Sequence, residues 1–512
     1  MAVYGIDFGT CYSCLAVAEE GKEIKVLPTR DNRGTLPSVV EFRLKKDGTP
    51  RVCDAAKRSI TPTSRNVAAF LKSEMDQEAS TLEYEVSQGE RRHISPVEFA
   101  ACIYRELYGY ANTQRSNNQE TTSRQAVITV PAVCSELQRE KTKAAAEAAG
   151  LEVLKIINEP TAAAISYNIG VGETILVFDL GGGTHDVSIV QRRSENDYQV
   201  LASEGNPHLG GKLWDEKLVE LTWQKAGLAF TPDVLSHPRL IEFESHKINL
   251  CQGDDVTFAF MDDTGIQHQV TIDLELFEDF TQQLVEKAID VATRAVAKAK
   301  EHNSSLKIDR ICMAGGTCHM NAIKRALTQA FPLTPVALTN PDGAIASGAA
   351  QLGLSLVQQG GNSQYDLRIT ERGHAYGIKV VNSQGQCEIE NFIMRNDPLV
   401  IQSRTLRRYK PTTSNSWNLA VFENNIDLPA FAFKGQKPFF SADLTFDRTL
   451  LVSTPLDVSF QRDANGLVHI TVMANGKKYN YDFATTAGSI SDEILQRVQH
   501  LIQQMNATYE YV

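Results

Sequence analysis

Apolar and polar positions follow two different patterns along the first 357 residues. Short continuous apolar runs predict buried strands, and segments with helical periodicity or many small residues predict helices. The strands are expected at 126–130, 153–157 and 311–314, and the helices at 135–149, 161–167, 274–301 and 343–352. Strands that alternate with helices in this way are typical of an α/β domain.

The pattern changes at the Gln-, Gly- and Asn-rich stretch that begins at Gln358, which predicts a linker over 358–368. From 369 to 487 short alternating strands, with turns at Asn382-Ser383 and 463–466, predict a β-sandwich. An apolar stripe behind Ser491 then predicts one amphipathic helix within 488–512. The chain is thus expected to have a 1–357 domain, a linker, an all-β domain and a short helical end.

One motif occurs twice in the α/β part. Gly5-Ile6-Asp7-Phe8-Gly9-Thr10 returns in outline as Val177 to Thr184, each a strand followed by Asp, glycine and Thr. Glycines let backbone N–H groups approach phosphate oxygens, and Thr hydroxyls add donors. An Asp repels phosphate but can hold hydrated Mg²⁺ or orient a water. Two such hairpins facing each other would grip a nucleotide polyphosphate.

Composition narrows the class of protein. The 512 residues suggest two or three domains, and the net charge of −11 disfavours a nucleic-acid partner. No apolar run is long enough for a membrane span, and no basic or apolar leader precedes the first strand, which favours the cytoplasm. The nine cysteines are scattered and odd in number, so we expect free thiols, including Cys11 and Cys14.

Generic nucleotide motifs do not fit. The segment 205–212 approaches a P-loop but has Leu213 where Ser or Thr belongs. Asp7-Phe8-Gly9 spells a protein-kinase motif without the glycine loop or catalytic loop that should precede it. Gly315-Gly316-Thr317 follows a predicted buried strand, where α/β sheets bind ligands.

Taken together, the motifs resemble those of the heat-shock 70-kilodalton (DnaK-like) chaperone family, in the right order over nearly the whole chain. They are Gly5 to Thr10, Val130 to Ala132, Ile157 to Ala164, Phe178 to Thr184, Leu209 to Gly211, Gly315 to Thr317, Asn340 to Asp342, Met394 to Asn396 and Asp463 to Gly466. The resemblance implies an actin-like, two-lobed α/β ATPase domain that binds ATP or ADP with Mg²⁺. A β-sandwich that binds extended peptides and a helical lid should follow, so the last segment, 488–512, would be a truncated lid.

The resemblance also assigns site residues. Lys72, Asp7, Glu159, Asp179, Thr184 and Asp186 would be catalytic, with Lys72 holding the attacking water and Asp7 and Asp179 binding Mg²⁺ through water. The nucleotide would be held by Gly9, Thr10, Cys11, Tyr12, Gly181, Gly182, Gly183, Gly210, Gly211, Glu244, Lys247, Cys251, Gly315, Gly316, Thr317 and Asp342. Ile389, Trp417 and Leu419 would line the peptide cleft.

Several positions depart from the family pattern. Cys11 replaces a Thr, Ile248 replaces an Arg that stacks on adenine, and Lys212-Leu213 replace two acids. The linker offers only Tyr365, Leu367 and Ile369 in place of a run of leucines. The family implies a J-domain co-chaperone and a nucleotide-exchange factor as partners, although no acidic tail motif for co-chaperone capture is present.

Three functions remain open on the sequence. The first is a slow ATPase chaperone, in which nucleotide sets peptide affinity during protein folding and the stress response. The second is a nucleotide-binding regulatory or scaffold protein without client cycling, favoured by the altered linker and the short lid. The third is a small-molecule kinase on an actin-like fold, which leaves the β-rich domain unexplained.

Overall fold

The computed structural model of the chain describes most of the α/β part and more than half of the remainder. The described residues are 2–28, 34–42, 49–61, 64, 66–75, 77, 83–87, 90–132, 134–194, 197–261, 266–358, 368–370, 375–394, 402–406, 415–424, 428–435, 438, 440–446, 455–462, 468–474, 476–482 and 491–509. None of the helices in these ranges combines the length and the apolarity needed to cross a membrane.

The chain divides into two compact units. The first holds residues 1–132, 142–369 and 492–512, and the second holds 133–141 and 370–491. The expected turn at 463–466, the linker residues Tyr365 and Leu367, and part of the Met394 to Asn396 motif lie outside the described residues.

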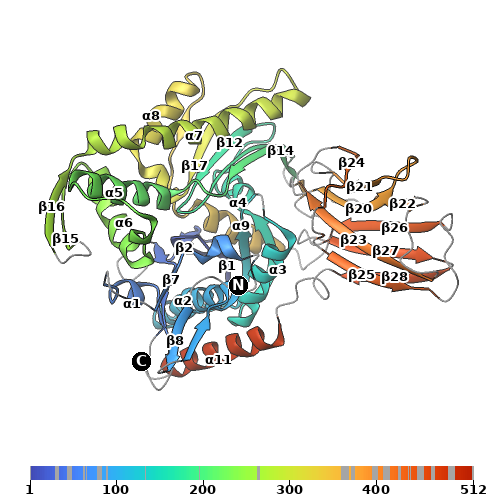
Figure 1. Ribbon diagram of the computed structural model, residues 1–512, viewed down its shortest axis with the longest axis horizontal. Helices are drawn as coiled ribbons and strands as arrows, with labels where there is room; N and C mark the ends of the chain where they lie inside the picture. The colour runs from blue at the N-terminus through green and yellow to red at the C-terminus, as the bar shows by residue number, and fades with distance from the viewer. Residues whose placement is uncertain are drawn as a thin grey trace. The chain divides into compact units, whose positions relative to one another are not determined.

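Two six-stranded sheets form the centre of the first unit (Figure 1). The first sheet has the order β11-β10-β1-β2-β3, with β4 also pairing with β2. Its strands are β1 (Ala2–Asp7), β2 (Tyr12–Glu19), β3 (Lys25–Val26), β4 (Thr35–Pro37), β10 (Gln125–Val130) and β11 (Glu152–Asn158). β1, β10 and β11 run parallel, whereas β1 and β2 form an antiparallel hairpin.

The second sheet repeats this arrangement, with the order β18-β17-β12-β13-β14-β19. Its strands are β12 (Thr174–Leu180), β13 (His185–Ser194), β14 (Asp197–Asn206), β17 (Arg310–Ala314), β18 (Val336–Ala337) and β19 (Arg368–Thr370). The β12–β13 hairpin corresponds to β1–β2, and β17 runs parallel to β12 as β10 does to β1. The motif that occurs twice in the sequence therefore corresponds to a strand arrangement that occurs twice in the structure.

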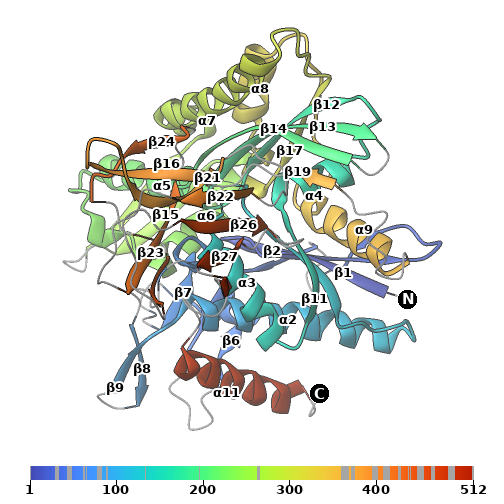
Figure 2. The same cartoon turned by 90° about the vertical axis from the view of Figure 1, so that its right-hand side faces the viewer.

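Helices pack on and between these sheets (Figures 1 and 2). They are α1 (Asp54–Lys57), α2 (Pro96–Asn117), α3 (Glu136–Ala148), α4 (Glu159–Ser166), α5 (Gly211–Lys225), α6 (His237–Cys251), α7 (Leu274–His302), α8 (Asn321–Ala330) and α9 (Ala344–Gln358), with the 3-10 turns η1 (Leu71–Glu74), η2 (Pro232–Val234) and η3 (Gly316–His319). α4 and α9 approach so closely that a Cβ on Gly348 would lie 1.7 Å from the Ala162 carbonyl oxygen. Their small residues are what permits this contact.

Small sheets complete the first unit. β5 (Val39–Glu41), β6 (Arg51–Val52) and β7 (Val67–Ala69) form one, and β8 (Glu83–Ser87) pairs with β9 (Glu90–His93). β15 (Val256–Met261) and β16 (Gln267–Ile272) form a hairpin.

The second unit contains two antiparallel sheets, as the alternating pattern predicted. One has the order β24-β21-β20-β23-β25 and the other β22-β26-β27-β28. The strands are β20 (Ala375–Val381), β21 (Cys387–Ile393), β22 (Gln402–Leu406), β23 (Ser416–Asn424), β24 (Ala430–Ala432), β25 (Phe440–Thr445), β26 (Leu456–Arg462), β27 (Val468–Ala474) and β28 (Lys477–Asp482). The turn at Asn382 is confirmed, since its side chain accepts hydrogen bonds from the Gln384 and Gln386 amides.

The C-terminal helix α11 (Asp492–Tyr509) belongs to the first unit, where it lies along α2 (Figures 1 and 2). Its apolar stripe is buried there through Val498, Ile502 and Met505. The Arg497 guanidinium pairs with Glu98, a buried residue of α2, at 2.5 Å. This differs from the expected lid: the stripe is as predicted, but its partner in the structure is α2 of the ATPase part.

The end of the linker is also part of the first unit. β19 adds a strand to the second sheet beside β14, and it includes Ile369. The division between the two units falls immediately after this residue.

Candidate functional site

The candidate catalytic residues come from the strand ends of both sheets. Asp7 ends β1, and Glu159 begins α4 directly after β11. Asp179 and Asp186 face each other as a residue pair in the β12–β13 hairpin. Parallel strands of one sheet end at the same edge, so each sheet presents its acids at that edge.

Lys72 joins this group from the 3-10 turn η1. Its Nζ lies 2.7 Å from Glu159 Oε1, and both side chains are largely buried. Burial alone favours the neutral amine, but the negative charges of Glu159 and Asp7 raise the pKa of Lys72 above its ordinary value. Lys72 is therefore a permanent cation among carboxylates.

The carboxylates raise one another's pKa. Burial, and then the charge of Glu159, raises the pKa of Asp7 to about 7 and that of Asp186 to about 7. The same two causes raise the pKa of Asp179 well above its usual range. Close like charges in a poorly solvated place favour a bound proton or a bound cation.

The two glycine hairpins face each other across a narrow gap. A Cβ on Gly182 would fall 2.2 Å from Cys11 Sγ, and a Cβ on Gly183 would fall 2.7 Å from Thr10 Oγ1. Within the first hairpin a Cβ on Gly9 would fall 1.9 Å from the Tyr12 carbonyl oxygen. No side chain fits at these positions, so backbone amides are left accessible as donors.

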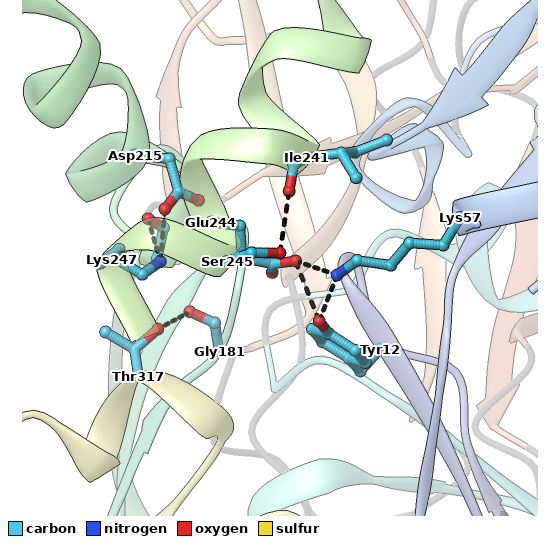
Figure 3. Close-up of polar contacts among 10 residues, drawn as sticks. Tyr12, Lys57, Gly181, Asp215, Ile241, Glu244, Ser245, Lys247 and Thr317 are labelled. Atoms are coloured by element: carbon cyan, nitrogen blue, oxygen red, sulfur yellow. Dashed lines mark hydrogen bonds and ion pairs between the residues drawn. The ribbon is translucent and has the colours of Figure 1, made fainter. Parts of the chain in front are cut away.

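A three-residue cluster contains Tyr12 and Glu244, two of the residues expected to hold the nucleotide (Figure 3). Glu244 Oε2 of α6 accepts a hydrogen bond from the Tyr12 hydroxyl at 3.0 Å and pairs with Lys57 Nζ at 2.8 Å. Lys57 Nζ also lies 2.6 Å from the Tyr12 hydroxyl oxygen. Segments from three distant parts of the chain thus meet at one carboxylate.

Lys247 lies one turn further along α6 and contacts two residues of α5 (Figure 3). Its Nζ lies 2.7 Å from Asp215 Oδ1 and donates to the Gly211 carbonyl at 3.0 Å. Burial, opposed by the charge of Lys247, raises the pKa of Asp215 to about 7. The Thr317 hydroxyl donates to the Gly181 carbonyl at 2.9 Å. Gly210, Gly211 and Thr317 are thereby held against the second hairpin.

The remaining predicted nucleotide residues lie around the same place. Gly315 has φ of 84°, and a Cβ there would lie 2.5 Å from the Leu180 carbonyl oxygen. Asp342 Oδ2 lies 2.8 Å from His319 Nε2, and a Cβ on Gly316 would meet Asp342 at 3.2 Å. Cys251 is half-buried at the end of α6, and Ile248 is exposed on that helix.

These residues fit a polyphosphate with a hydrated cation. The glycine cradle would be filled by any Cβ, and the buried acids need positive charge beside them. Within the described ranges no three His, Cys, Asp or Glu side chains are placed to hold a metal ion directly. Binding of Mg²⁺ through water at Asp7 and Asp179 remains a prediction. All nine cysteines are free.

The residues expected to bind peptide lie in the second unit. Ile389 is on β21, and Trp417 and Leu419 are on β23. Their exposed fractions are 1%, 2% and 0%, and Trp417 and Leu419 belong to the hydrophobic core between the two sheets. Their role in a cleft remains a prediction, and it requires part of this core to open.

Sequence reasoning missed two residues of the site, Lys57 and Asp215, and one contact of a third, Lys212. Lys57 follows a short, weakly patterned segment and carries no motif. Asp215, exposed by 1%, could have been found as an acid at helical spacing among the apolar positions of α5. Lys212 was noticed as a departure from the family, but its contact with Phe70 was not foreseen.

The two sheets share one topology, and at their strand ends they carry acidic residues and glycine hairpins of the kind that bind phosphate. This combination defines an actin-like ATPase, which is followed here by a β-sandwich. The family model described as Hsp70 protein matches residues 3–510. The chain belongs to the Hsp70 family, whose members are ATPases.

Proposed function

We propose that the protein is an ATP-dependent chaperone that hydrolyses ATP slowly and binds extended polypeptide segments through its β-sandwich. The observation that supports this most is the buried pair of Lys72 and Glu159 beside Asp7, Asp179 and the facing glycine hairpins. Membership of the Hsp70 family supports the same proposal.

In this proposal the two hairpins bind the phosphates through backbone amides, with Thr10 and Thr184 adding hydroxyl donors. Asp7 and Asp179 would hold hydrated Mg²⁺, which would neutralise phosphate charge when bound. Lys72 orients the attacking water and stabilises the charge that develops on the γ-phosphate. Since Lys72 stays protonated, it acts as a cation and not as a base.

The adenosine end has its own residues. Glu244 and Lys247 would lie on the adenosine side, and the Tyr12 hydroxyl and Lys57 fix the orientation of the Glu244 carboxylate. Ile248 offers an apolar face where an Arg would stack on adenine, so adenine should bind more weakly. We place the protein in the cytoplasm, with a J-domain co-chaperone and a nucleotide-exchange factor as partners.

Steady-state ATPase activity with and without an unfolded peptide tests the proposal. We expect slow turnover that the peptide stimulates and that Lys72→Ala removes. Turnover without any response to peptide would instead favour a nucleotide-binding scaffold. The burial of Trp417 and Leu419 and the position of α11 on α2 favour that second candidate.

A further inference from the structure

The turn that carries Lys72 begins at an unusual residue. Phe70 precedes η1 with φ of 64° and ψ of 10°, and no side chain caps the turn. The left-handed region is costly for a bulky aromatic residue, which therefore needs support from its surroundings. Phe70 is only 7% exposed, so that support comes from packing.

Two groups from the second-sheet half of the unit contact the Phe70 ring. The His237 ring, at the start of α6, meets it edge-on at 5.4 Å between centroids. Lys212 Nζ, at the start of α5, lies 5.3 Å from its centroid. Burial, and then the charge of Lys212, lowers the pKa of His237 to about 4. At neutral pH Lys212 is thus the cation of this cluster.

Lys212 is tied to the second glycine hairpin through its backbone. Its amide donates to the Gly182 carbonyl at 2.7 Å, and the Gly211 amide donates to the Gly181 carbonyl at 2.9 Å. Lys212 therefore makes two contacts. Its backbone contacts the hairpin proposed to bind phosphate, and its ammonium group contacts Phe70 at the start of the turn that carries Lys72. Its other ionic contact, to Glu216 at 3.5 Å, is a partly exposed pair within one helix and is weak.

We propose that Phe70 and Lys212 are positioning residues, whose cation–π contact holds the Lys72 turn in register with the Gly181 to Thr184 hairpin. The proposal rests on the proposed role of Lys72 in hydrolysis. An acid at position 212, as the family pattern has, would not be attracted to the ring face, so the contact depends on this chain's own departure.

Single and double variants test the contact. Lys212→Gln removes the cation and shortens the side chain by one atom, and Phe70→Leu keeps an apolar side chain but removes the ring. Each should lower kcat for ATP roughly threefold to tenfold with KM changed less than about twofold, since the ground-state contacts stay. The double variant should be no worse than either single one, because both remove the same contact. Lys212→Arg and Phe70→Tyr should retain activity.

Lys217→Gln is the matched control. Lys217 lies on the same helix, with its Nζ 5.9 Å from the Phe280 centroid, and none of the proposed site residues is part of that contact. It should leave kcat unchanged. Independent losses that multiply in the double variant, or an equal loss in Lys217→Gln, would overturn the proposal.

Amide hydrogen exchange over residues 70–75 without nucleotide gives a second readout. Exchange should be faster in Lys212→Gln and Phe70→Leu than in the wild type, and unchanged in Lys217→Gln. If Lys72→Ala keeps full activity, the proposed function fails, and exchange alone decides whether the contact holds the turn. If Phe70→Leu does not fold, Lys212→Gln, Lys212→Arg and Lys217→Gln decide the matter.

Discussion

Lys72 Nζ and Glu159 Oε1 lie 2.7 Å apart, with side-chain exposures of 13% and 5%. The pair joins the η1 turn to the start of α4, directly after the end of β11. A buried pair of this kind leaves a costly unpaired charge when either partner is removed. Variants at Lys72 must therefore be read for stability as well as for activity.

Lys72→Ala should lower ATP hydrolysis by about 10²–10³-fold and change nucleotide affinity only a few-fold. The lysine acts on charge that develops in the transition state, whereas the glycine hairpins provide the binding. Single-turnover hydrolysis and equilibrium binding of a fluorescent nucleotide measure the two effects. The double variant Lys72→Ala/Glu159→Gln also removes the carboxylate that Lys72→Ala leaves unpaired. Lys22→Ala is the control for the loss of an exposed lysine. Hydrolysis within a few-fold of the wild type would show that Lys72 is not the catalytic lysine.

Gly182→Ala should weaken nucleotide binding at least tenfold, because the new Cβ would fall 2.2 Å from Cys11 Sγ and 2.7 Å from Cys11 Cβ. Adding Cys11→Gly removes both obstacles and should restore part of the affinity. Gly170→Ala is a suitable control, since the nearest atom to its Cβ is 3.6 Å away. Isothermal titration calorimetry distinguishes these cases; equal affinities for the wild type and Gly182→Ala would contradict the facing arrangement of the hairpins.

Cys11 should react with maleimide slowly at neutral pH. Burial, and then the charge of Glu244, raises the pKa of this thiol well above its usual range, so little thiolate is present. Once attached, a maleimide would occupy the gap beside Gly182 and block nucleotide binding, and bound ATP should protect the thiol. Mass spectrometry of labelled peptides measures the rate, with Cys11→Ser as the unlabelled control. Full labelling with unchanged nucleotide affinity would exclude Cys11 from the phosphate site.

Arg497→Ala should destabilise the first unit. Glu98 is 2% exposed and would lose the guanidinium group that pairs with its carboxylate. Since Arg497 itself is 25% exposed, we expect a loss of about 1–2 kcal/mol, or roughly 2–5 °C in thermal midpoint. Gln499→Ala, on an exposed position of the same helix, should have little effect. An unchanged midpoint for Arg497→Ala would mean that α11 is not held on α2.

The His319–Asp342 pair should depend on pH. The hydrogen bond from His319 to Asp342 raises the pKa of the imidazole. The pair therefore contributes stability below about pH 6.5, and this contribution is lost as pH rises through the folded-state pKa. Histidine NMR titration should show the pKa of His319 falling towards its ordinary value in Asp342→Asn. His208→Asn should leave it unchanged, and a pKa unaffected by Asp342→Asn would contradict the pairing.

For helices and strands with a strong hydrophobic periodicity, the bounds predicted from the sequence lie close to those in the structure. The helix expected at 274–301 is Leu274–His302, and the strand expected at 126–130 is Gln125–Val130. The repeated hairpin also predicted that acids and glycines from distant segments would converge, because strand ends of parallel sheets share an edge.

Tertiary partners could not be predicted in the same way. The stripe on α11 indicates that some surface covers it, but nothing in its spacing identifies α2. Lys57 meets Glu244 only because α1 and α6 are brought together by the fold. The contact of Lys212 with Phe70 depends on a left-handed residue that propensity argues against.

The strand β19 occupies the outer edge of the second sheet beside β14. An uncovered edge strand offers unpaired amide and carbonyl groups on which another chain can add a strand. By pairing with β14, the three-residue strand β19 occupies backbone groups that would otherwise be open on that longer strand, and it leaves only a short edge of its own. A fragment ending at Gln358 would lose this cover, so its solubility would decline as β14 became a template for self-association.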